Sequence, residues 1–420
     1  MRGREGLFSE NGLRRVGKTG VRVVIVGNGL SGTIASKTIR ELDPVADIAI
    51  FAEENHLYYP RPNLIEFLAG DMSEPDLFAF TKEWFANQNI SLHLGRPVVE
   101  LHPGSKEIEL EGGKREPYDF LLLANGASSW IPPIQGTGKN GVFTLRTLDD
   151  SLKIIEWIED NPNVVIIGGG LLGLEISRAV RARGAEVRVV EFFPRLLPRQ
   201  LDAEGASVLQ SQIEKMGIHV QLGVVTEEIL GKENIKGLKL KGGDELDAEA
   251  AIVAAGVRPN IQLASEAGLD TDKGIIVDDY LRTSHEDIYA AGDNVQHKDR
   301  IYGIIPASFN QARTAAFNIA GQEKKYTGTV PSNTLKVVGL DLTAIGIVNP
   351  EGEAHTEIRK ADAKKGIYKK IVLKEGKAVG AIWMGTKENV NAINRIVLQQ
   401  VEVEKWKGSL LEEGFDFSVL

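Results

Sequence analysis

The sequence predicts an α/β protein made of two copies of one domain, followed by a third domain of α+β type. A β-branched run that leads directly into the pattern GxGxxG occurs twice, and the segments after each copy repeat in the same order. The pattern changes after Val330, which sets the C-terminal part of the chain apart. A chain of 420 residues is long enough for two or three such domains.

The first glycine motif follows the β-branched run 23–26 and consists of Gly27, Gly29 and Gly32. In such a motif the first glycine makes the tight turn from strand to helix. The second lets the backbone approach a pyrophosphate, and the third lets the helix pack closely on the strand. The phosphates then lie at a helix N-terminus, where free N–H groups and the helix dipole favour negative charge.

The second glycine motif is built in the same way, with Gly168, Gly170 and Gly173 after the run 164–167. One GxGxxG pattern alone is as often an ordinary strand–turn–helix as a nucleotide site. Two of them, each in the context of a strand and a helix, predict two bound dinucleotides and therefore redox chemistry between cofactors.

The rest of the first half also repeats in the second, at an offset of about 130 to 140 residues. The next strand, 47–51, leads to Glu53, and its counterpart 186–190 leads to Glu191. A carboxylate at this position suits a ribose, because it can accept hydrogen bonds from both vicinal hydroxyls. The later segments recur in order, 90–95 as 218–223, 108–113 as 238–243 and 118–126 as 248–256. The chain therefore contains a whole nucleotide-binding domain twice.

The composition restricts the chemistry and the partners. The net charge of −9 disfavours nucleic acid or an anionic membrane as the main partner, and no apolar run is long enough to span a bilayer. The absence of cysteine excludes disulfides, thiolate metal sites and a redox-active thiol pair. Seven histidines without paired spacing predict no metal site. Residues 1–20 lack the apolar core of a secretory signal, so we expect a flexible extension on a cytoplasmic protein.

After Val330 the pattern predicts a separate α+β domain over residues 331–420, joined by a linker at 321–331. Its expected strands and helix are 334–338, 368–373, 378–383 and 389–400. The domain has no glycine motif, and packing or subunit contact is its simplest role. A homodimer through this domain and a monomer both remain open.

Together these motifs resemble the FAD-dependent pyridine-nucleotide oxidoreductases that have two dinucleotide-binding domains. Segment 283–293 is similar to the second FAD motif of that family. Segment 122–126 with Pro132 and Pro133 is similar to the link between its domains, and 255–260 echoes that link. The resemblance covers nearly the whole chain from Val21 onward.

The resemblance implies two Rossmann-like domains, of which the first binds FAD and the second binds NAD(P)H. It also implies that the NAD(P)H domain, residues 143–268, is inserted into a discontinuous FAD domain made of residues 21–142 and 269–330. Residues 331–420 then form the C-terminal interface domain.

Three further segments, 58–62, 194–202 and 332–346, are similar to rubredoxin reductases and to the flavin portion of assimilatory nitrite reductase large subunits. This branch implies that hydride passes from NADH to FAD and that electrons then pass to an external acceptor, rubredoxin or a similar small iron protein. Two other functions stay open. One is a peroxide-forming NADH oxidase, and the other is a flavin-bearing subunit of a larger oxidoreductase.

The resemblance also assigns candidate site residues. For FAD they are Gly27, Gly29, Ser31, Gly32, Glu53, Arg61, Pro62, Val98, Asn125, Gly126, Arg146 and Asp293. For NAD(P)H they are Gly168, Gly170, Gly173, Glu175, Glu191 and Gly256. A carboxylate at Glu191 binds a ribose 2′-hydroxyl and repels a 2′-phosphate, so we expect NADH to be preferred. Arg195 lies nearby in the sequence and could reduce the preference for NADH over NADPH.

The chain departs from the family in two ways. Relatives that work through a thiol carry cysteine near the flavin, which segment 64–70 lacks. The ferredoxin-reductase-like branch has a lysine that pairs with a glutamate beside the flavin N5. That glutamate aligns with Glu175, and the lysine's position is occupied by Glu66. Two carboxylates near one flavin would repel, which would raise a pKa or turn one of them aside. Neither residue is assigned a catalytic role with certainty.

Overall fold

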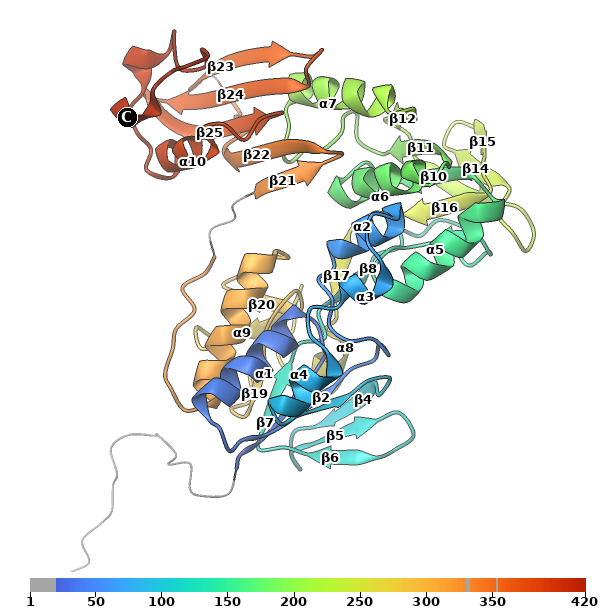
Figure 1. Ribbon diagram of the computed structural model, residues 1–420, viewed down its shortest axis with the longest axis vertical. Helices are drawn as coiled ribbons and strands as arrows, with labels where there is room; N and C mark the ends of the chain where they lie inside the picture. Colours follow the sequence, from blue (N-terminus) through green and yellow to red (C-terminus); the bar gives the residue numbers. More distant parts are fainter. Residues whose placement is uncertain (1–19, 330–332, 353) are drawn as a thin grey trace, which may run out of the picture. The chain divides into compact units, whose positions relative to one another are not determined.

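The computed structural model describes residues 20–329, 333–352 and 354–420, which form two compact units (Figure 1). The first unit contains residues 20–60, 78–128 and 258–329, and the second contains 61–77, 129–257 and the described residues from 333 onward. The predicted extension at residues 1–20 lies outside the described residues except for Gly20, and so does the end of the predicted linker 321–331.

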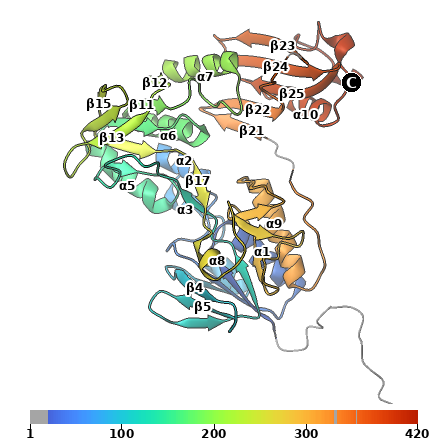
Figure 2. The same ribbon diagram turned by 180° about the vertical axis from the view of Figure 1, so that it is seen from behind.

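The core of the first unit is a parallel sheet with the strand order β19-β7-β1-β2-β3. Its strands are β1 (Arg22–Val26), β2 (Asp47–Phe51), β3 (Ile90–His93), β7 (Phe120–Leu123) and β19 (Ile288–Ala290). Near-continuous apolar strands of this kind are typical of sheets covered on both faces. Helices α1 (Leu30–Leu42) and α9 (Ile305–Ile319) pack side by side in this unit (Figures 1 and 2).

Smaller elements complete the first unit. An antiparallel sheet consists of β4 (Val98–His102), β5 (Glu107–Leu110) and β6 (Arg115–Pro117). A parallel pair consists of β18 (Ile275–Val277) and β20 (Val295–His297), and the short helices are α4 (Lys82–Asn87) and α8 (Gln262–Glu266). The paired strands β8 (Ala127–Ser129) and β17 (Val257–Pro259) lie where the chain leaves this unit and returns to it.

The second unit contains a parallel sheet with the order β12-β11-β10-β16-β9. Its strands are β9 (Val142–Phe143), β10 (Asn163–Ile167), β11 (Glu186–Glu191), β12 (Ile218–Leu222) and β16 (Ala250–Val253). Its helices are α2 (Asn63–Ala69), α3 (Glu74–Leu77), α5 (Leu148–Asp160), α6 (Leu171–Ala182) and α7 (Ala203–Lys215). An antiparallel sheet consists of β13 (Thr226–Leu230), β14 (Gly237–Leu240) and β15 (Glu245–Asp247).

The two parallel sheets confirm the repeat that the sequence predicts. Read from the opposite edge, the first sheet has the order β3-β2-β1-β7-β19, and each of its first four strands corresponds to the strand in the same place of β12-β11-β10-β16. Each copy also carries a three-stranded antiparallel sheet at the same place in the chain. The predicted fold class, two Rossmann-like domains with a C-terminal α+β domain, is therefore confirmed.

The C-terminal part of the second unit is an antiparallel sheet with the order β21-β22-β25-β24-β23. Its strands are β21 (Asn333–Val337), β22 (Leu340–Gly346), β23 (His355–Asp362), β24 (Ile367–Lys374) and β25 (Lys377–Met384). Helix α10 (Val390–Leu398) covers one face, where Trp383 and Ile393 belong to one apolar cluster. The short 3-10 helices are η1 (Glu404–Trp406) and η2 (Phe417–Val419).

The other face of this antiparallel sheet joins the core of the second unit. Tyr368, Ile382 and Met384 share an apolar cluster with Leu209 and Ile213 of α7. Strands β23 and β24 accordingly lie beside α7 (Figure 2). The C-terminal domain is thus packed on the second nucleotide-binding copy of its own chain. Among the described residues, no helix is both long and apolar enough to cross a membrane.

Candidate dinucleotide-binding sites

The first glycine loop connects β1 to α1, and the packing of the protein requires glycine at two of its three glycine positions. Gly27 has φ +108°, and a Cβ there would lie 2.4 Å from the carbonyl oxygen of Ala124. A Cβ on Gly32 would lie 2.0 Å from the oxygen of Gly27. A Cβ on Gly29 would meet no described atom within 4 Å. The first and third glycines are therefore needed for packing, and the second faces open space.

The second loop, between β10 and α6, has the same geometry. Gly168 has φ +117°, and a Cβ there would lie 2.6 Å from the oxygen of Ala254. On Gly173 a Cβ would lie 1.9 Å from the oxygen of Gly168, whereas on Gly170 it would meet no described atom within 4 Å.

The helices after both loops begin without a side-chain cap. Gly29 and Gly170 are the N-cap residues of α1 and α6, and neither offers a side-chain acceptor to the first turn of its helix. The first N–H groups of a helix need an acceptor from outside the helix. Two open loops with uncapped helix N-termini fit the pyrophosphate of a dinucleotide at each site.

An unpartnered donor adds to this fit at the first loop. The Asn28 side chain accepts a hydrogen bond at Oδ1 from Thr33 Oγ1 at 3.2 Å. Its Nδ2 atom is buried and has no hydrogen-bond partner among the described residues. A buried amide donor without a partner is costly, so a ligand oxygen at this place would stabilise it. Sequence reasoning did not assign Asn28, although a polar residue between the two glycines was a signal.

The structure brings Ser31 and Asp293 together through a residue that the sequence did not single out. Ser308 lies in the first turn of α9, and its Oγ donates to Asp293 Oδ1 at 3.3 Å. Ser31 Oγ donates to the carbonyl oxygen of Ser308 at 3.4 Å. A Cβ on Gly292 would lie 2.7 Å from Ser31 Oγ, so the backbone beside Asp293 packs against α1.

Asn125 and Gly126 belong to a second polar cluster of the first unit. Asn125 Nδ2 donates to the oxygen of Asn260 at 3.2 Å, and Asn260 Nδ2 donates to the oxygen of Asn125 at 2.8 Å. The backbone N–H of Asn260 donates to the oxygen of Gly126. Asn294 is fully buried and donates to Asn125 Oδ1 at 2.8 Å. The Asn125 side chain thus bonds within the protein at both of its polar atoms.

The other FAD candidates are divided between the two units. Glu53 is exposed just after β2, and Val98 begins β4, where it packs against the core of the first unit. Arg61, Pro62 and Arg146 belong to the second unit. Arg61 Nη1 donates to the oxygen of Arg146 at 2.6 Å, and Pro62 is exposed at the start of α2. The structure thus brings the two arginines together.

Glu191, at the end of β11, is buried, unlike Glu53. Its Oε2 accepts a hydrogen bond from the backbone N–H of Gly169 at 2.5 Å, and its Oε1 accepts one from Phe193 at 2.8 Å. A Cβ on Gly169 would lie 3.2 Å from the Glu191 carboxylate. The carboxylate therefore lies directly against the second glycine loop. Gly256 has φ +107°, and its oxygen accepts from the N–H of Trp130.

Glu66 and Glu175 do not form the repelling pair that the sequence predicts. Arg178 lies between them: its Nη2 is 3.3 Å from Glu66 Oε1, and its Nε is 3.3 Å from Glu175 Oε2. A third carboxylate, Asp71, lies 3.8 Å from Nη1. The expectation is wrong because it ignored this cation on α6. The signal was available, since Glu175 and Arg178 have the i, i+3 spacing of a helical ion pair.

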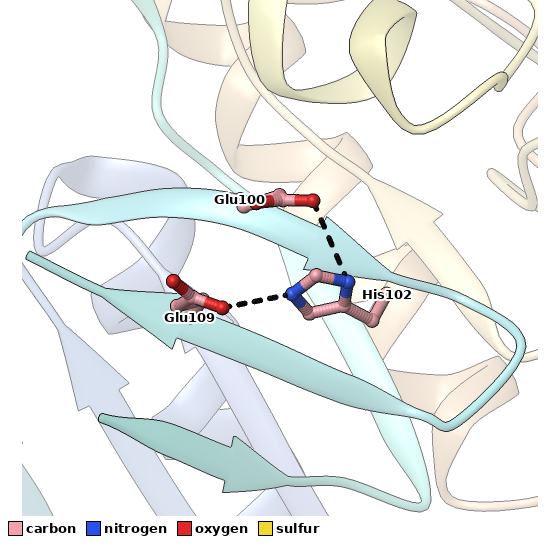
Figure 3. Close-up of side chains that lie close together, drawn as sticks. All are labelled: Glu100, His102 and Glu109. Atoms are coloured by element: carbon pink, nitrogen blue, oxygen red, sulfur yellow. Dashed lines mark hydrogen bonds and ion pairs between the residues drawn. The ribbon is translucent and has the colours of Figure 1, made fainter. Parts of the chain in front are cut away.

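The described residues contain one cluster with metal-ligand chemistry, Glu100, His102 and Glu109 on β4 and β5 (Figure 3). His102 Nε2 lies 3.1 Å from Glu109 Oε2, and Nδ1 lies 3.6 Å from Glu100 Oε1. Glu109 also holds Arg115 at 3.0 Å. Hydrogen bonds from His102 and Arg115 lower the pKa of Glu109. This cluster is adequately described as a surface ion-pair network.

Comparison with known proteins finds relatives that match most of this chain. The chain is 35% identical over 397 residues to a nitrite reductase [NAD(P)H] of Bacillus subtilis, with 93% of this chain and 49% of the relative covered. It is 33% identical over 416 residues to an NADH oxidase of Methanocaldococcus jannaschii, with 92% and 93% covered. The crystal structure of a ferredoxin reductase from Rhodopseudomonas palustris has a TM-score of 0.84, 27% identity, and 95% and 99% coverage.

The first curated relatives are about twice as long as this chain, which spans 49%, 51% and 47% of them. The profile of the pyridine nucleotide-disulphide oxidoreductases matches residues 21–316, and that of the rubredoxin NAD+ reductase C-terminal domain matches residues 331–401. The chain therefore belongs to the pyridine nucleotide-disulphide oxidoreductases, a family of FAD- and NAD(P)H-dependent enzymes.

Proposed function

We propose that the protein is an NADH-dependent reductase with bound FAD as its cofactor. It would deliver electrons to a small iron protein, with rubredoxin as the first candidate. The observation that carries this proposal is the pair of glycine loops, in which Gly29 and Gly170 both face open space at an uncapped helix N-terminus. The match of residues 331–401 to the C-terminal domain of rubredoxin NAD+ reductase supports the acceptor.

FAD, when bound, would supply the redox chemistry, because it can take a hydride from NADH and release the two electrons one at a time. The part of the protein is to bind and orient. The first turn of α1 would hold the FAD pyrophosphate, with the Asn28 amide as a further donor. Asp293, held by Ser308, and the exposed Glu53 would accept hydrogen bonds from the hydroxyl groups of FAD.

For the nicotinamide nucleotide we propose that the N-terminus of α6 binds the pyrophosphate and that Glu191 binds the ribose, with NADH preferred. Glu191 lies against the loop and holds two backbone N–H groups. Each carboxylate oxygen has a second lone pair left for a ribose hydroxyl. A 2′-phosphate at the same place would meet a buried carboxylate of like charge, and this repulsion disfavours NADPH.

The proposal is tested by an anaerobic titration of the FAD-loaded protein with NADH, followed by addition of oxidised rubredoxin. We expect the visible flavin absorbance to bleach with NADH and to recover on addition of rubredoxin before air is admitted. A matched titration with NADPH at the same concentrations measures the coenzyme preference. Bleaching without recovery on rubredoxin would contradict the proposed acceptor.

Two alternatives each rest on one comparison, and the same experiment separates them. A relative named as an NADH oxidase matches over 93% of its own length, which favours direct reaction with oxygen. Recovery only on admission of air, with stoichiometric peroxide, would indicate this function. A nitrite reductase matches over only 49% of its length, which favours a flavin-bearing part of a larger oxidoreductase. A yellow protein that NADH leaves oxidised would indicate that function.

The proposal includes the domain limits drawn from the sequence: residues 21–142 with 269–330 for FAD, 143–268 for NAD(P)H and 331–420 as the interface domain. A cytoplasmic location and a homodimer through the C-terminal domain stay predictions. Sedimentation analysis of the full chain, compared with a chain that ends before residue 331, measures the oligomeric state.

A further inference from the structure

Arg178 holds the centre of an ion-pair cluster in the second unit. It lies on α6 three residues after Glu175, and its three nitrogens face Glu175, Glu66 and Asp71 at 3.3, 3.3 and 3.8 Å. Its side chain is 23% exposed and that of Glu175 is 19% exposed, so this pair is shielded from solvent more than Glu66 or Asp71. A planar guanidinium carries five N–H donors in a fixed geometry, so it can bond to several carboxylates in defined directions.

The second oxygen of Glu175 reaches the C-terminal domain. Glu175 Oε1 accepts a hydrogen bond from the backbone N–H of Val338 at 2.5 Å. Val338 lies in the turn between β21 and β22, is buried, and has φ +46°. A β-branched residue in this region is strained, and such strain persists only where the surroundings hold the residue in place. A charge-assisted hydrogen bond from Glu175 is a contact of that kind.

The cluster therefore connects three elements of one unit. Glu66 lies on α2, Glu175 and Arg178 lie on α6, and Val338 lies in the C-terminal sheet. Glu175 is in the second turn of α6, two residues after Gly173 of the glycine loop. What fixes Glu175 thus also fixes the start of the helix whose N-terminus faces the proposed dinucleotide.

We propose that Arg178 is a positioning residue for NADH binding, which acts by holding Glu175 and through it the N-terminal end of α6. The inference rests on the proposed function, because it assigns a role toward the coenzyme of that same site. Binding residues must be held by neighbours whose own conformation is fixed, and Arg178 together with Val338 holds Glu175 at both oxygens.

The test compares R178Q, E175Q, the double variant R178Q/E175Q and the conservative variant R178K, each loaded with FAD. Calorimetric titration with NAD+ gives the dissociation constant, steady-state kinetics give KM for NADH and kcat, and thermal unfolding gives Tm. Lys153→Gln is the matched control, because it removes one positive charge from an exposed position on α5 of the same unit.

We expect R178Q and E175Q each to weaken NAD+ binding and to raise KM by about threefold to tenfold. In R178Q the change in KM should exceed the change in kcat, because Arg178 acts on binding through Glu175. The double variant should be no weaker than the weaker single variant, because Arg178 acts through Glu175. R178K should recover part of the affinity, and K153Q should bind NAD+ as the parent protein does.

Three results would overturn the inference. In the first, the effects of R178Q and E175Q multiply in the double variant, which means that the two residues act independently. In the second, E175Q tightens NAD+ binding, which means that only the net charge near α6 matters. In the third, R178Q binds NAD+ as the parent does. If R178Q does not fold, the same comparison of two single variants with their double variant can be made with R178K and E175Q. Failure of the parent protein to bind NAD+ would instead refute the proposed function.

Discussion

The two glycine loops have the same backbone geometry, but the acidic residues that accompany them differ. Glu53 follows its strand as an exposed side chain. Glu191 is 7% exposed and bonds to the N–H of Gly169 inside the second loop. The residue between the first and second glycines also differs between the loops. Asn28 has a buried donor without a described partner, whereas a side chain at Gly169 would meet Glu191.

This difference indicates that the glycine motif and the ligand contacts are determined by different residues. The first and third glycines are required by backbone atoms within 2.6 Å of an added Cβ, and this holds in both copies. The contacts around each loop depend on residues distant in sequence, such as Glu191, which lies 22 residues from Gly169. In the first loop the amide donor of Asn28 has no described partner, whereas in the second loop the N–H of Gly169 already bonds to Glu191.

The largest expected effect on cofactor binding comes from replacing the third glycine of one loop at a time by alanine. In G32A the added Cβ would lie 2.0 Å from a backbone oxygen, and in G173A 1.9 Å, so each should destabilise its loop by more than about 3 kcal/mol. G32A should lose FAD. G173A should keep FAD, measured by its absorbance, but should no longer be reduced by NADH.

G29A is the matched control for this pair, since a Cβ at Gly29 meets no described atom within 4 Å. It should keep the Tm of the apoprotein and lose only FAD affinity. Equal FAD content in G32A and the parent protein would contradict the assignment of the first loop.

A second contrast is that the second copy is tied to the C-terminal sheet by a buried charge network. Lys370 is 1% exposed and lies 2.9 Å from Asp202 and 2.8 Å from Glu357. Tyr368 also donates to Asp202 at 2.7 Å. Burial and the Asp202 carboxylate raise the pKa of Tyr368 well above its usual range, so it stays a donor.

Lys370→Met should therefore destabilise the protein by about 3 kcal/mol, because it leaves two partly buried carboxylates without their cation. Urea unfolding followed by tryptophan fluorescence measures this effect, since every tryptophan except Trp84 lies in the second unit. Lys374→Met, at an exposed position of the same strand, should change the midpoint little. Equal effects of the two variants would refute the buried network.

Replacement of Glu53 and of Glu191 by alanine should affect the stability of the apoprotein differently. E191A leaves the N–H groups of Gly169 and Phe193 without their acceptor, so the apoprotein should lose about 1 to 3 kcal/mol of stability. E53A should leave the stability of the apoprotein unchanged and weaken FAD binding. Urea unfolding of the apoproteins and FAD titration measure both effects. A larger loss of stability in E53A would reverse the comparison.

The charge network also predicts a dependence on pH. Burial opposes ionisation of Asp202, but hydrogen bonds from Lys370, Tyr368 and the N–H of Gly205 outweigh it and lower the pKa below the ordinary value of 3.8. A carboxyl group with a lowered pKa stabilises the fold above its ordinary pKa, and the stabilisation is lost as the pH falls through the lowered value. Unfolding midpoints from pH 6 down to about pH 3 should fall less steeply in D202N than in the parent protein.

The smallest effect concerns the choice of coenzyme. The kcat/KM for NADH should exceed that for NADPH by at least about tenfold, since a 2′-phosphate would meet the Glu191 carboxylate. In E191Q the ratio should fall toward unity, while K153Q should keep it. Comparable kcat/KM for the two coenzymes in the parent protein would contradict the role given to Glu191.

The sequence predicted the fold well because its signals are local. A β-branched run, a glycine turn and a helix are adjacent in the chain, and their recurrence predicted two copies of one domain, which the two parallel sheets confirm. The three expected C-terminal strands lie within one residue of the bounds of β21, β24 and β25, since turns such as Gly376 separate alternating segments. Strands β22 and β23 were not predicted.

Contacts between residues far apart in the chain could not be predicted from these local sequence patterns. Glu66 is 112 residues from Arg178, and Val338 is 163 residues from Glu175, so no local pattern showed that these residues meet. The sequence showed that Tyr368 and Lys370 share a face of a strand, because side chains alternate. It could not show that the face is buried, since a lysine is rarely buried without a partner and Asp202 lies 168 residues away.

The reciprocal amide bonds of Asn125 and Asn260 have a consequence for how such a chain can be rearranged. The main chain leaves the first unit after Ser128 and returns at Arg258, and these bonds, with one from Ser128 to Asn260, fasten the exit and the return to each other. The intervening segment 129–257 also packs on α2 and on the C-terminal sheet, which belong to the same unit. A homologous segment with another coenzyme preference could therefore be transplanted at these two points only together with matching residues 61–77 and a matching C-terminal domain.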